Sequence, residues 1–375
     1  MTPKQRVAFV ANTSWSIYKF RLQLLKALMQ RGFDVYVLAP RDKYSIFFEH
    51  TEGLIFIELK KFKSKSISLQ DDLGLYRELL SHYKSIRPEL IFHYTIKANI
   101  YGSLAAAHAS CPAIAVITGL GYMFTGKSIF RSIASLLYRY ALRKTKEVWF
   151  LNPDDQQAFI KAGLVPEKKT FLLPGEGVNT IAFYPVPYEY KTAPISFLLI
   201  ARLIEHKGVY EFAAAADLLR IKKINAQCSI LGFFDEGSAV AIPRGRLSQW
   251  ENDKTINYLG ETDNVIPFIA AADCIVLPSY REGLPLSLLE GASMCKALIA
   301  TDVAGCREVI RDGVNGFLCC EKDPADLAAK MEIYCALPAA EKKAMGMAGR
   351  ELVLDHFTQE IVTGIYLAKL NLFKR

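Results

Sequence analysis

The stretch Cys274–Glu290 reads CIVLPSYREGLPLSLLE and combines a strand, a turn and a helix in seventeen residues. Its apolar start is typical of a buried parallel strand, and a Gly-Pro turn then leads into an apolar helix. One glutamate, Glu282, precedes that turn, and a second, Glu290, follows in the helix. This order predicts one unit of a parallel sheet, with polar side chains at the carboxyl end of the strand, where such sheets bind ligands.

The same alternation of apolar runs and helical patterns extends along all 375 residues, which is more than one hydrophobic core usually holds. It restarts after a polar, Pro-rich stretch at 183–194. We therefore predict an α/β protein of two Rossmann-like domains, parallel sheets with helices on both faces, that face each other across a cleft. The predicted bounds are 1–185 for the N-terminal domain, 186–356 for the C-terminal domain, and 357–375 for a helix that packs back on the N-terminal domain.

The elements that this pattern predicts are thirteen strands and, among the helices, six long ones. The strands are expected at 6–12, 34–40, 54–59, 90–95, 113–118, 147–152, 170–174, 196–203, 226–233, 256–260, 274–278, 297–301 and 315–319. The six helices are expected at 17–30, 69–86, 128–144, 324–336, 339–354 and 359–373.

The net charge of +8 is unevenly distributed. Residues 1–185 hold 25 Lys and Arg against 14 Asp and Glu (25 − 14 = +11), and residues 186–375 hold 21 against 24 (21 − 24 = −3). The basic half predicts an anionic partner, either a membrane surface or a substrate that carries a diphosphate. Because the chain has no recognition-helix pattern and no zinc spacing, nucleic acid is not expected.

Cysteines and apolar stretches indicate a compartment. The eight cysteines include no CxxC spacing, so we expect reduced thiols and no metal site. The N-terminus lacks the pattern of a signal peptide, and no run approaches the ~20 apolar residues of a membrane-spanning helix. We expect a cytoplasmic protein that associates peripherally with the inner face of the cell membrane.

Two cations follow the strand predicted at 196–203. In ARLIEHKG, Arg202 ends the strand and Lys207 stands just before the next helix. A guanidinium that binds two oxygens and an ammonium beside it form a suitable site for a diphosphate. A pair of ordinary surface charges is the alternative.

The loop that contains Glu282 offers further groups that could bind a phosphate and a sugar. Gly283 allows backbone amides to approach a ligand closely, and Pro285 suits the first turn of a helix, whose free N–H groups favour a phosphate. Glu282 would accept hydrogen bonds from sugar hydroxyls. Glu290 would take both hydroxyls of a ribose. Two further loops, LGFFDEG with Phe233 and LGETDN preceded by Tyr258, could flank a base, or be ordinary loops.

The arrangement Arg202…Lys207…Glu282-x7-Glu290 resembles the retaining glycosyltransferases of family four, which have the GT-B fold. GEGVNTIAFYP (175–185) and VAGCREVIRDGVNGFL (303–318) resemble two further motifs of that family, in the same order. The resemblance implies that Arg202 and Lys207 hold the diphosphate of a UDP-sugar donor. It also implies that Glu282 and the amides near Gly283 and Leu284 hold the donor sugar, that Glu290 holds the ribose, and that no metal or cofactor is needed; the sequence has no DxD motif.

The stretch TGLGYMFTG (118–126) resembles the subgroup that builds bacterial capsule, O-antigen and protein-glycan precursors on undecaprenyl diphosphate. Many other family members carry a histidine where Thr118 stands. The resemblance places the acceptor beside the loops that leave the first and fifth strands. The residues expected there are Asn12, Ser14, Ser16, Thr118, Gly119 and Gly121. A helix cap at Ser14 or Ser16, and a tight surface turn at the glycines, are the alternatives.

Two other features of the N-terminal half have open interpretations. His93 and Lys97 stand at a strand's exit, where His93 is more simply a hydrogen-bonded strand residue than a base. The basic helix at 128–144, with Arg131, Arg139, Arg143 and Lys144, could lie at a membrane interface or pack on the sheet.

Together these features predict a retaining glycosyltransferase. It would move a hexose or N-acetylhexosamine from a UDP-sugar to a sugar acceptor, expected to be linked to undecaprenyl diphosphate, and form an α-linkage. The alternatives are a UDP-sugar 2-epimerase of the same fold and a non-catalytic two-domain sugar-binding protein.

Overall fold

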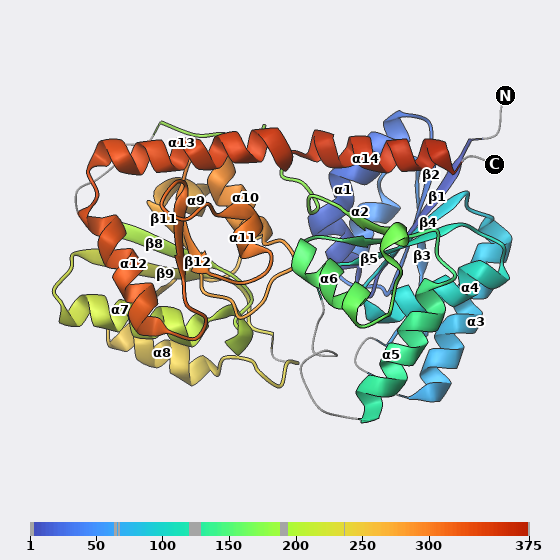
Figure 1. The fold of residues 1–375 in the computed structure, drawn as a ribbon, viewed down its shortest axis with the longest axis horizontal. Helices are drawn as coiled ribbons and strands as arrows, with labels where there is room; N and C mark the ends of the chain where they lie inside the picture. The colour runs from blue at the N-terminus through green and yellow to red at the C-terminus, as the bar shows by residue number, and fades with distance from the viewer. Residues whose placement is uncertain are drawn as a thin grey trace. The chain divides into compact units, whose positions relative to one another are not determined.

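The computed structural model describes residues 4–63, 66, 68–119, 129–187, 194–235 and 237–373, without the side chains of 129–134. The chain divides into two compact units, Met1–Glu176 with Gln359–Arg375, and Gly177–Thr358 (Figure 1). We call them the first and the second unit. The division falls between Glu176 and Gly177 rather than after residue 185, and the stretch that we expected to link the domains begins inside the second unit.

The first unit is built on a parallel sheet in the order β3-β2-β1-β4-β5-β6-β7. Its strands are β1 (Arg6–Val10), β2 (Asp34–Ala39), β3 (Leu54–Glu58), β4 (Leu90–Tyr94), β5 (Ala113–Ile117), β6 (Glu147–Phe150) and β7 (Thr170–Leu172). Its α-helices are α1 (Ser14–Gln30), α2 (Ser45–Glu49), α3 (Leu69–Ile86), α4 (Ser103–His108), α5 (Ile129–Leu142), α6 (Pro153–Lys161) and α14 (Gln359–Leu372). A π-helix at Ala98–Gly102 precedes α4.

The C-terminal helix α14 belongs to the first unit because aromatic side chains fix it to the sheet. The Tyr366 ring lies 4.7 Å from that of Phe92 and 5.0 Å from that of Trp149 between centroids. Its hydroxyl is 2.7 Å from that of Tyr94. These rings are almost fully buried, so α14 packs its aromatic side chain into the core of the first unit.

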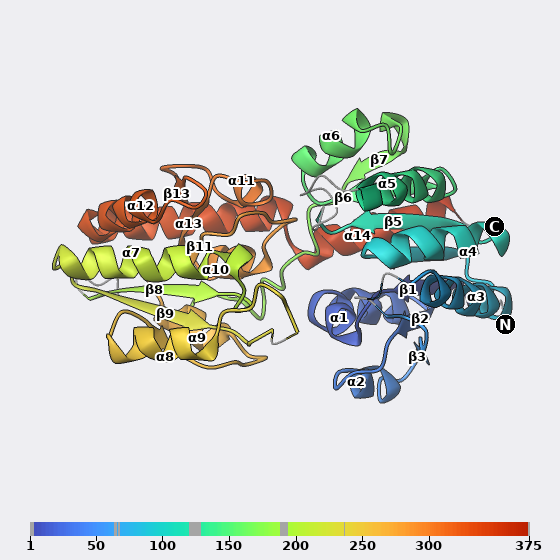
Figure 2. The ribbon, with the colours of Figure 1, turned by 90° about the horizontal axis from the view of Figure 1, so that it is seen from below.

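The second unit holds a parallel sheet in the order β10-β9-β8-β11-β12-β13. Its strands are β8 (Ile195–Ile200), β9 (Ala226–Leu231), β10 (Asn257–Tyr258), β11 (Cys274–Leu277), β12 (Ala297–Thr301) and β13 (Gly316–Cys319). Its helices are α7 (Val209–Ile221), α8 (Arg244–Asn252), α9 (Ile266–Ala271), α10 (Leu286–Ser293), α11 (Cys306–Val309), α12 (Pro324–Ala336) and α13 (Ala339–His356). Figure 2 shows helices on both faces of each sheet.

The thirteen predicted strands are all present, and the prediction of two Rossmann-like domains is confirmed. Small differences occur at helix starts. α1 begins at Ser14 rather than Ile17, because Thr13 is its N-cap and the Thr13 hydroxyl accepts the Ser16 N–H at 3.2 Å. Pro285 is the N-cap residue of α10 and not part of its first turn.

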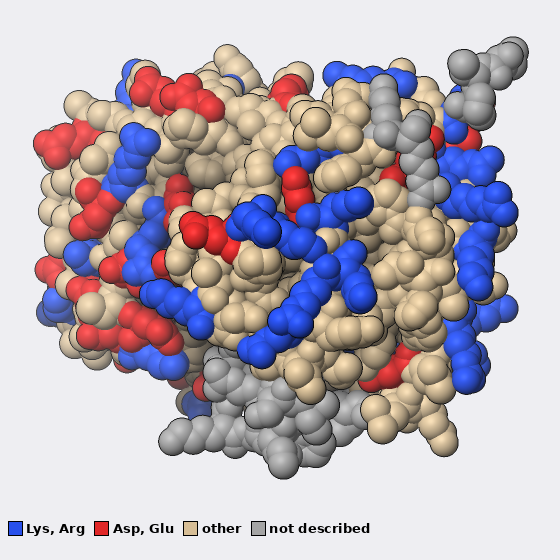
Figure 3. Space-filling model, turned by 45° about the vertical axis from the view of Figure 1, so that its right-hand side comes forward, with Lys and Arg blue, Asp and Glu red and all other residues tan. Residues whose placement is uncertain are grey.

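The surface of the protein is unevenly charged, as the sequence indicates. Figure 3 shows Lys and Arg gathered along its right-hand edge, whereas both signs mix on its left. Within the described ranges, no helix is long and apolar enough to cross a membrane.

Candidate donor and acceptor sites

The first cationic loop lies at the carboxyl end of β8. After β8 the chain adds β9 and β10 on one side of it and then β11 to β13 on the other, so β8 is a topological switch point, where ligands bind in α/β sheets. Arg202 follows β8 and is 44% exposed, with Nη1 3.1 Å from Oδ2 of Asp235 in the loop after β9. The guanidinium is therefore held at the edge of the sheet but remains open to a ligand.

The second cation, Lys207, meets Glu282 from the loop after β11. Nζ of Lys207 lies 2.5 Å from Oε1 of Glu282, and both side chains are mostly covered, at 21% and 10% exposure. The two residues are far apart in sequence, and the neighbouring positions of β8 and β11 bring them together. The pair places a positive and a negative group side by side where a diphosphate and a sugar could bind.

Two glycines allow these loops to pack backbone against backbone. Gly208 has a φ of +70°, and a Cβ built on it would lie 2.0 Å from the carbonyl oxygen of Pro278. Gly305 has a φ of +80°, and its Cβ would lie 2.6 Å from the carbonyl oxygen of Gly283. Only glycine fits at either place. We did not single out these glycines from the sequence, although Gly208 directly follows the helical turn Glu205–Lys207, a position where a positive φ favours glycine.

Near this pair, the pKa of Cys306 depends on the charges of both residues. Cys306 is fully buried at the start of α11. Its pKa is raised well above the usual thiol value, first by burial and then by the charge of Glu282, while Lys207 opposes the shift. The thiol therefore stays neutral.

A further set of contacts that the sequence did not reveal supports the Glu282 loop. The Tyr280 hydroxyl donates to Oε1 of Glu211 on α7 at 2.8 Å, and the Tyr280 N–H donates to the carbonyl of His206 at 3.0 Å. The Thr301 hydroxyl donates to the carbonyl of Ser279. Burial and the bond to Glu211 raise the pKa of Tyr280, so its hydroxyl keeps its proton. The loop is thus fastened to both neighbouring loops.

Gly283 and Leu284 lie half-buried in the turn between Glu282 and α10. Glu290 lies in the second turn of α10 and is only 4% exposed. The role of its carboxylate toward a ribose stays a prediction.

The two loops expected beside a base are joined to one another. The Tyr258 hydroxyl donates to the Gly232 carbonyl at 2.8 Å, and its ring meets that of Phe234 edge-on at 5.8 Å. The carbonyl of Phe233 accepts the N–H of Leu203 at 3.0 Å. Phe233 and Tyr258 are therefore fixed at the same edge of the sheet as Arg202.

In the first unit, the residues that follow β1 and were expected on the acceptor side differ in how deeply they are buried. Asn12 and Ser16 remain half-buried at the edge of the sheet. Ser14 is fully buried, and its hydroxyl donates to the Pro40 carbonyl at 2.8 Å and accepts from the Ser45 hydroxyl at 3.0 Å. The structure thus uses Ser14 to hold the loop together, which corrects its assignment to the acceptor side.

Thr118 and Gly119 follow β5 and are half-buried, and Gly119 has a φ of +140° that favours glycine. Gly121 lies outside the described residues. The register pairs Val10 with His93 and Tyr94 with Val116. The exits of β1, β4 and β5 therefore lie next to one another, and they bring Asn12 and Thr118 to one edge.

His93 is a structural residue. It is fully buried, with Nε2 2.9 Å from the Tyr83 hydroxyl and the ring packed against Gly102. Burial lowers its pKa to about 3, which keeps the ring neutral. Lys97 is held by Asp72, whose Oδ1 lies 2.7 Å from Nζ. Their place at a strand exit suggests a catalytic base and a ligand-binding cation, but neither side chain is available for such a role.

The described part of the chain contains no group of three or more His, Cys, Asp or Glu side chains placed to hold a metal ion. Arg202 and Lys207 are the cations at the switch point of the second unit.

Known proteins share both halves of this architecture. Residues 6–152 match the family Glycosyl transferase 4-like, and residues 185–352 match Glycosyl transferases group 1. The chain is 28% identical over 348 residues to N,N'-diacetylbacillosaminyl-diphospho-undecaprenol alpha-1,3-N-acetylgalactosaminyltransferase of Campylobacter jejuni, and the match covers 88% of this chain and 89% of that protein.

Solved structures resemble the fold over nearly its full length. Sucrose-phosphate synthase from Thermosynechococcus elongatus superposes with a TM-score of 0.82 at 19% identity and covers 98% of both chains. HepE from Anabaena, solved in complex with UDP and glucose, superposes with a TM-score of 0.78 at 16% identity, over 98% of this chain and 99% of that one. With its two matched domains and this fold, the chain belongs to the GT-B glycosyltransferases, with a group 1 domain after a 4-like domain.

Proposed function

We propose that this glycosyltransferase moves a hexose or N-acetylhexosamine from a UDP-sugar to a sugar linked to undecaprenyl diphosphate, in the assembly of bacterial surface or protein glycans. The observation that carries the proposal is the Lys207–Glu282 pair at the switch point of the second unit. Two comparisons support it: HepE was solved with UDP and glucose, and the name of the Campylobacter relative specifies an undecaprenol-linked acceptor and an alpha linkage.

In this proposal, the donor binds at the carboxyl edge of the second sheet. The diphosphate replaces Asp235 as the partner of the half-exposed Arg202, whose planar guanidinium can bind two phosphate oxygens at once. Lys207 supplies a point charge on the other side. Glu290 takes the ribose hydroxyls, and Phe233 and Tyr258 flank the base.

Glu282 orients the donor sugar and does not attack it. Its Oε1 is held by the ammonium of Lys207, so its remaining acceptor capacity is directed to sugar hydroxyls, with the amides at Gly283 and Leu284 beside it.

Transfer retains the anomeric configuration. The bond from the anomeric carbon to the diphosphate breaks, and the acceptor hydroxyl forms its new bond on the same face. Its proton passes to a donor phosphate oxygen. Charge develops on the departing diphosphate, and Arg202 and Lys207 stabilise it there, a role that a divalent cation has in other enzymes. The reaction thus needs no cofactor or metal.

The acceptor binds to the basic first unit, beside Asn12, Ser16, Thr118 and Gly119. Helix α5 exposes Leu136 and Tyr140, at 64% and 52%, next to the cations at its end. Apolar side chains among cations favour the surface of an anionic bilayer. The enzyme would therefore work at the inner face of the cell membrane, where its lipid-linked acceptor lies.

The test is transfer from a panel of UDP-sugars to a synthetic polyprenyl-diphosphate-linked sugar, with the anomeric configuration of the product read by NMR. Lys207→Ala should lower kcat by about 10²–10³-fold because a group that stabilises developing charge is lost. Lys222→Ala is the matched control, because Lys222 pairs with Glu332 on the exposed surface of the same unit. Full activity of Lys207→Ala, inversion at the anomeric carbon, or a strict need for a divalent cation would overturn the proposal.

A further inference from the structure

Helix α2 in the first unit exposes apolar side chains at the carboxyl edge of the sheet. Only five residues long, it follows β2 and turns Ser45 and Phe48 inward. Its outer side chains are Ile46 and Phe47, which are 51% and 45% exposed. Single exposed hydrophobic residues are common and need no explanation, so the surroundings of this pair decide its meaning.

The exposed pair continues into an aromatic surface on α1. The Tyr18 ring stacks on that of Phe47 with 4.5 Å between centroids, and it lies 5.0 Å from the buried ring of Tyr44. Trp15 stands one helical turn before Tyr18 on the same face of α1. We call Trp15, Tyr18, Ile46 and Phe47 the apolar platform. The stacked rings of Tyr18 and Phe47 join its two helices.

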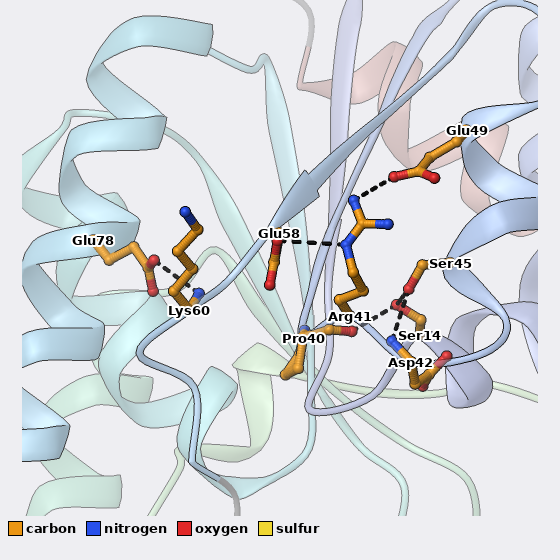
Figure 4. A network of polar contacts seen from close by, with 9 residues as sticks. All are labelled: Ser14, Pro40, Arg41, Asp42, Ser45, Glu49, Glu58, Lys60 and Glu78. Atoms are coloured by element: carbon orange, nitrogen blue, oxygen red, sulfur yellow. Dashed lines mark hydrogen bonds and ion pairs between the residues drawn. The ribbon is translucent and has the colours of Figure 1, made fainter.

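A buried polar network holds the platform in place (Figure 4). The Ser14 hydroxyl donates to the Pro40 carbonyl, and the Ser45 hydroxyl donates to Ser14. The Ser45 hydroxyl also accepts the Asp42 N–H at 2.9 Å. Ser14 and Ser45 are both fully buried, so these bonds join the first turns of α1 and α2 out of contact with water.

Two charged residues extend the network. Oδ2 of Asp42 accepts a hydrogen bond from the backbone N–H of Trp15 at 2.9 Å. Arg41 reaches Glu49 at the end of α2 at 2.5 Å and Glu58 at the end of β3 at 3.5 Å (Figure 4). The network keeps apolar side chains exposed to water in a fixed arrangement.

The platform lies where an acceptor would bind. β1 and β2 both end at this edge, and β4 and β5 bring their exits to it as well. Asn12 and Thr118, the acceptor residues of the proposed function, follow two of these strands. Lys43 lies with Nζ 5.0 Å from the centre of the Tyr44 ring, which itself lies beside the rings of Tyr18 and Phe47. Apolar surface beside a cation matches a ligand that joins a hydrocarbon chain to an anionic group.

We propose that the apolar platform binds the isoprene units next to the diphosphate of a polyprenyl-diphosphate-linked acceptor. Tyr18, Ile46 and Phe47 contact the chain, and Lys43 lies on the side of the diphosphate. The inference rests on the proposed acceptor class, but it concerns binding and can be tested without turnover. The platform would let the enzyme prefer lipid-linked acceptors over the same sugar diphosphate in free form.

The experiment measures binding of farnesyl diphosphate, a soluble prenyl diphosphate, by calorimetry and by the fluorescence of Trp15. The test variant is Ile46→Ser/Phe47→Ser, whose exposed positions should leave the fold intact. Leu69→Ser is the matched control, because Leu69 is 81% exposed at the start of α3 in the same unit. The test variant should bind farnesyl diphosphate about tenfold more weakly, since two apolar contacts are lost, while the control binds as the wild type does. Inorganic diphosphate should bind both variants and the wild type equally.

Three results would overturn the inference: absence of farnesyl diphosphate binding by the wild type, unchanged affinity in the test variant, or an equal loss of inorganic diphosphate binding. A fourth arm uses phosphatidylglycerol vesicles without prenyl diphosphate. If the double substitution weakens vesicle binding and leaves prenyl diphosphate binding intact, the platform meets the bilayer and not the acceptor chain. Wild-type binding of farnesyl diphosphate without any sugar transfer would refute the proposed function and leave this inference standing.

Discussion

Replacing Gly305 by alanine tests whether the backbone packing behind Glu282 positions the donor site. Gly305 has a φ of +80°, and an added Cβ would lie 2.6 Å from the carbonyl oxygen of Gly283 and 2.9 Å from that of Glu282. Both obstacles are backbone atoms, so no side chain can rotate away. The Glu282 loop or the start of α11 must move.

The size of the effect follows from these distances. Ordinary contact of a Cβ begins at 3.4 Å, so the Gly283 oxygen must retreat by 0.8 Å (3.4 − 2.6). A displacement of about 1 Å in a positioning group can cost ~10²-fold in rate. The left-handed backbone of an alanine costs a further ~1–2 kcal/mol of stability. Gly313 separates the two effects, because its φ is +74° and nothing lies within 4 Å of its Cβ.

The assay compares Gly305→Ala with Gly313→Ala by urea unfolding and by kcat/KM for the UDP-sugar. Both variants should lose about 1–2 kcal/mol of stability, and Gly305→Ala more because of its contacts. Only Gly305→Ala should lose kcat/KM, by about 10²-fold. If Gly305→Ala transfers sugar as well as Gly313→Ala does, Glu282 is not positioned by this packing, and the reasoning fails.

Two other predictions concern the first unit. Burial holds the pKa of His93 near 3, below its ordinary value of 6.5. Between these two values the unfolded chain takes up a proton that the folded chain does not. The free energy of unfolding present above pH 6.5 should therefore fall by ~1.4 kcal/mol per pH unit as the pH drops toward 3. Urea unfolding from pH 6.5 to 4.5 should show a shallower slope for His93→Gln than for the exposed control His50→Gln, and equal slopes would contradict the burial argument. Glu176→Gln should cost ~3–5 kcal/mol, because it leaves the buried guanidinium of Arg21 without its counter-charge. The double variant with Arg21→Met should regain much of that loss in the same urea assay, and a double variant no more stable than the single one would argue against the pair.

Local patterns in the sequence determined the elements and the family. Each strand could be recognised from the run of apolar side chains within it, so all thirteen were located from the sequence. The order of Arg202, Lys207, Glu282 and Glu290 gave the resemblance, because a strand exit, a cation and a Gly-Pro turn are short-range features. The burial of His93 was likewise predictable, since it stands within an apolar strand.

Only the tertiary structure decided which of these residues meet. The sheet order β9-β8-β11 places Asp235 beside Arg202 and Glu282 beside Lys207, and no local pattern encodes that order. Ser14 was expected at the acceptor site and is instead buried, because its partners arrive from the loop after β2. Pairing between strands distant in the chain depends on packing of whole sheets. The sequence therefore determined the parts of the site, and the packing determined which charges face one another.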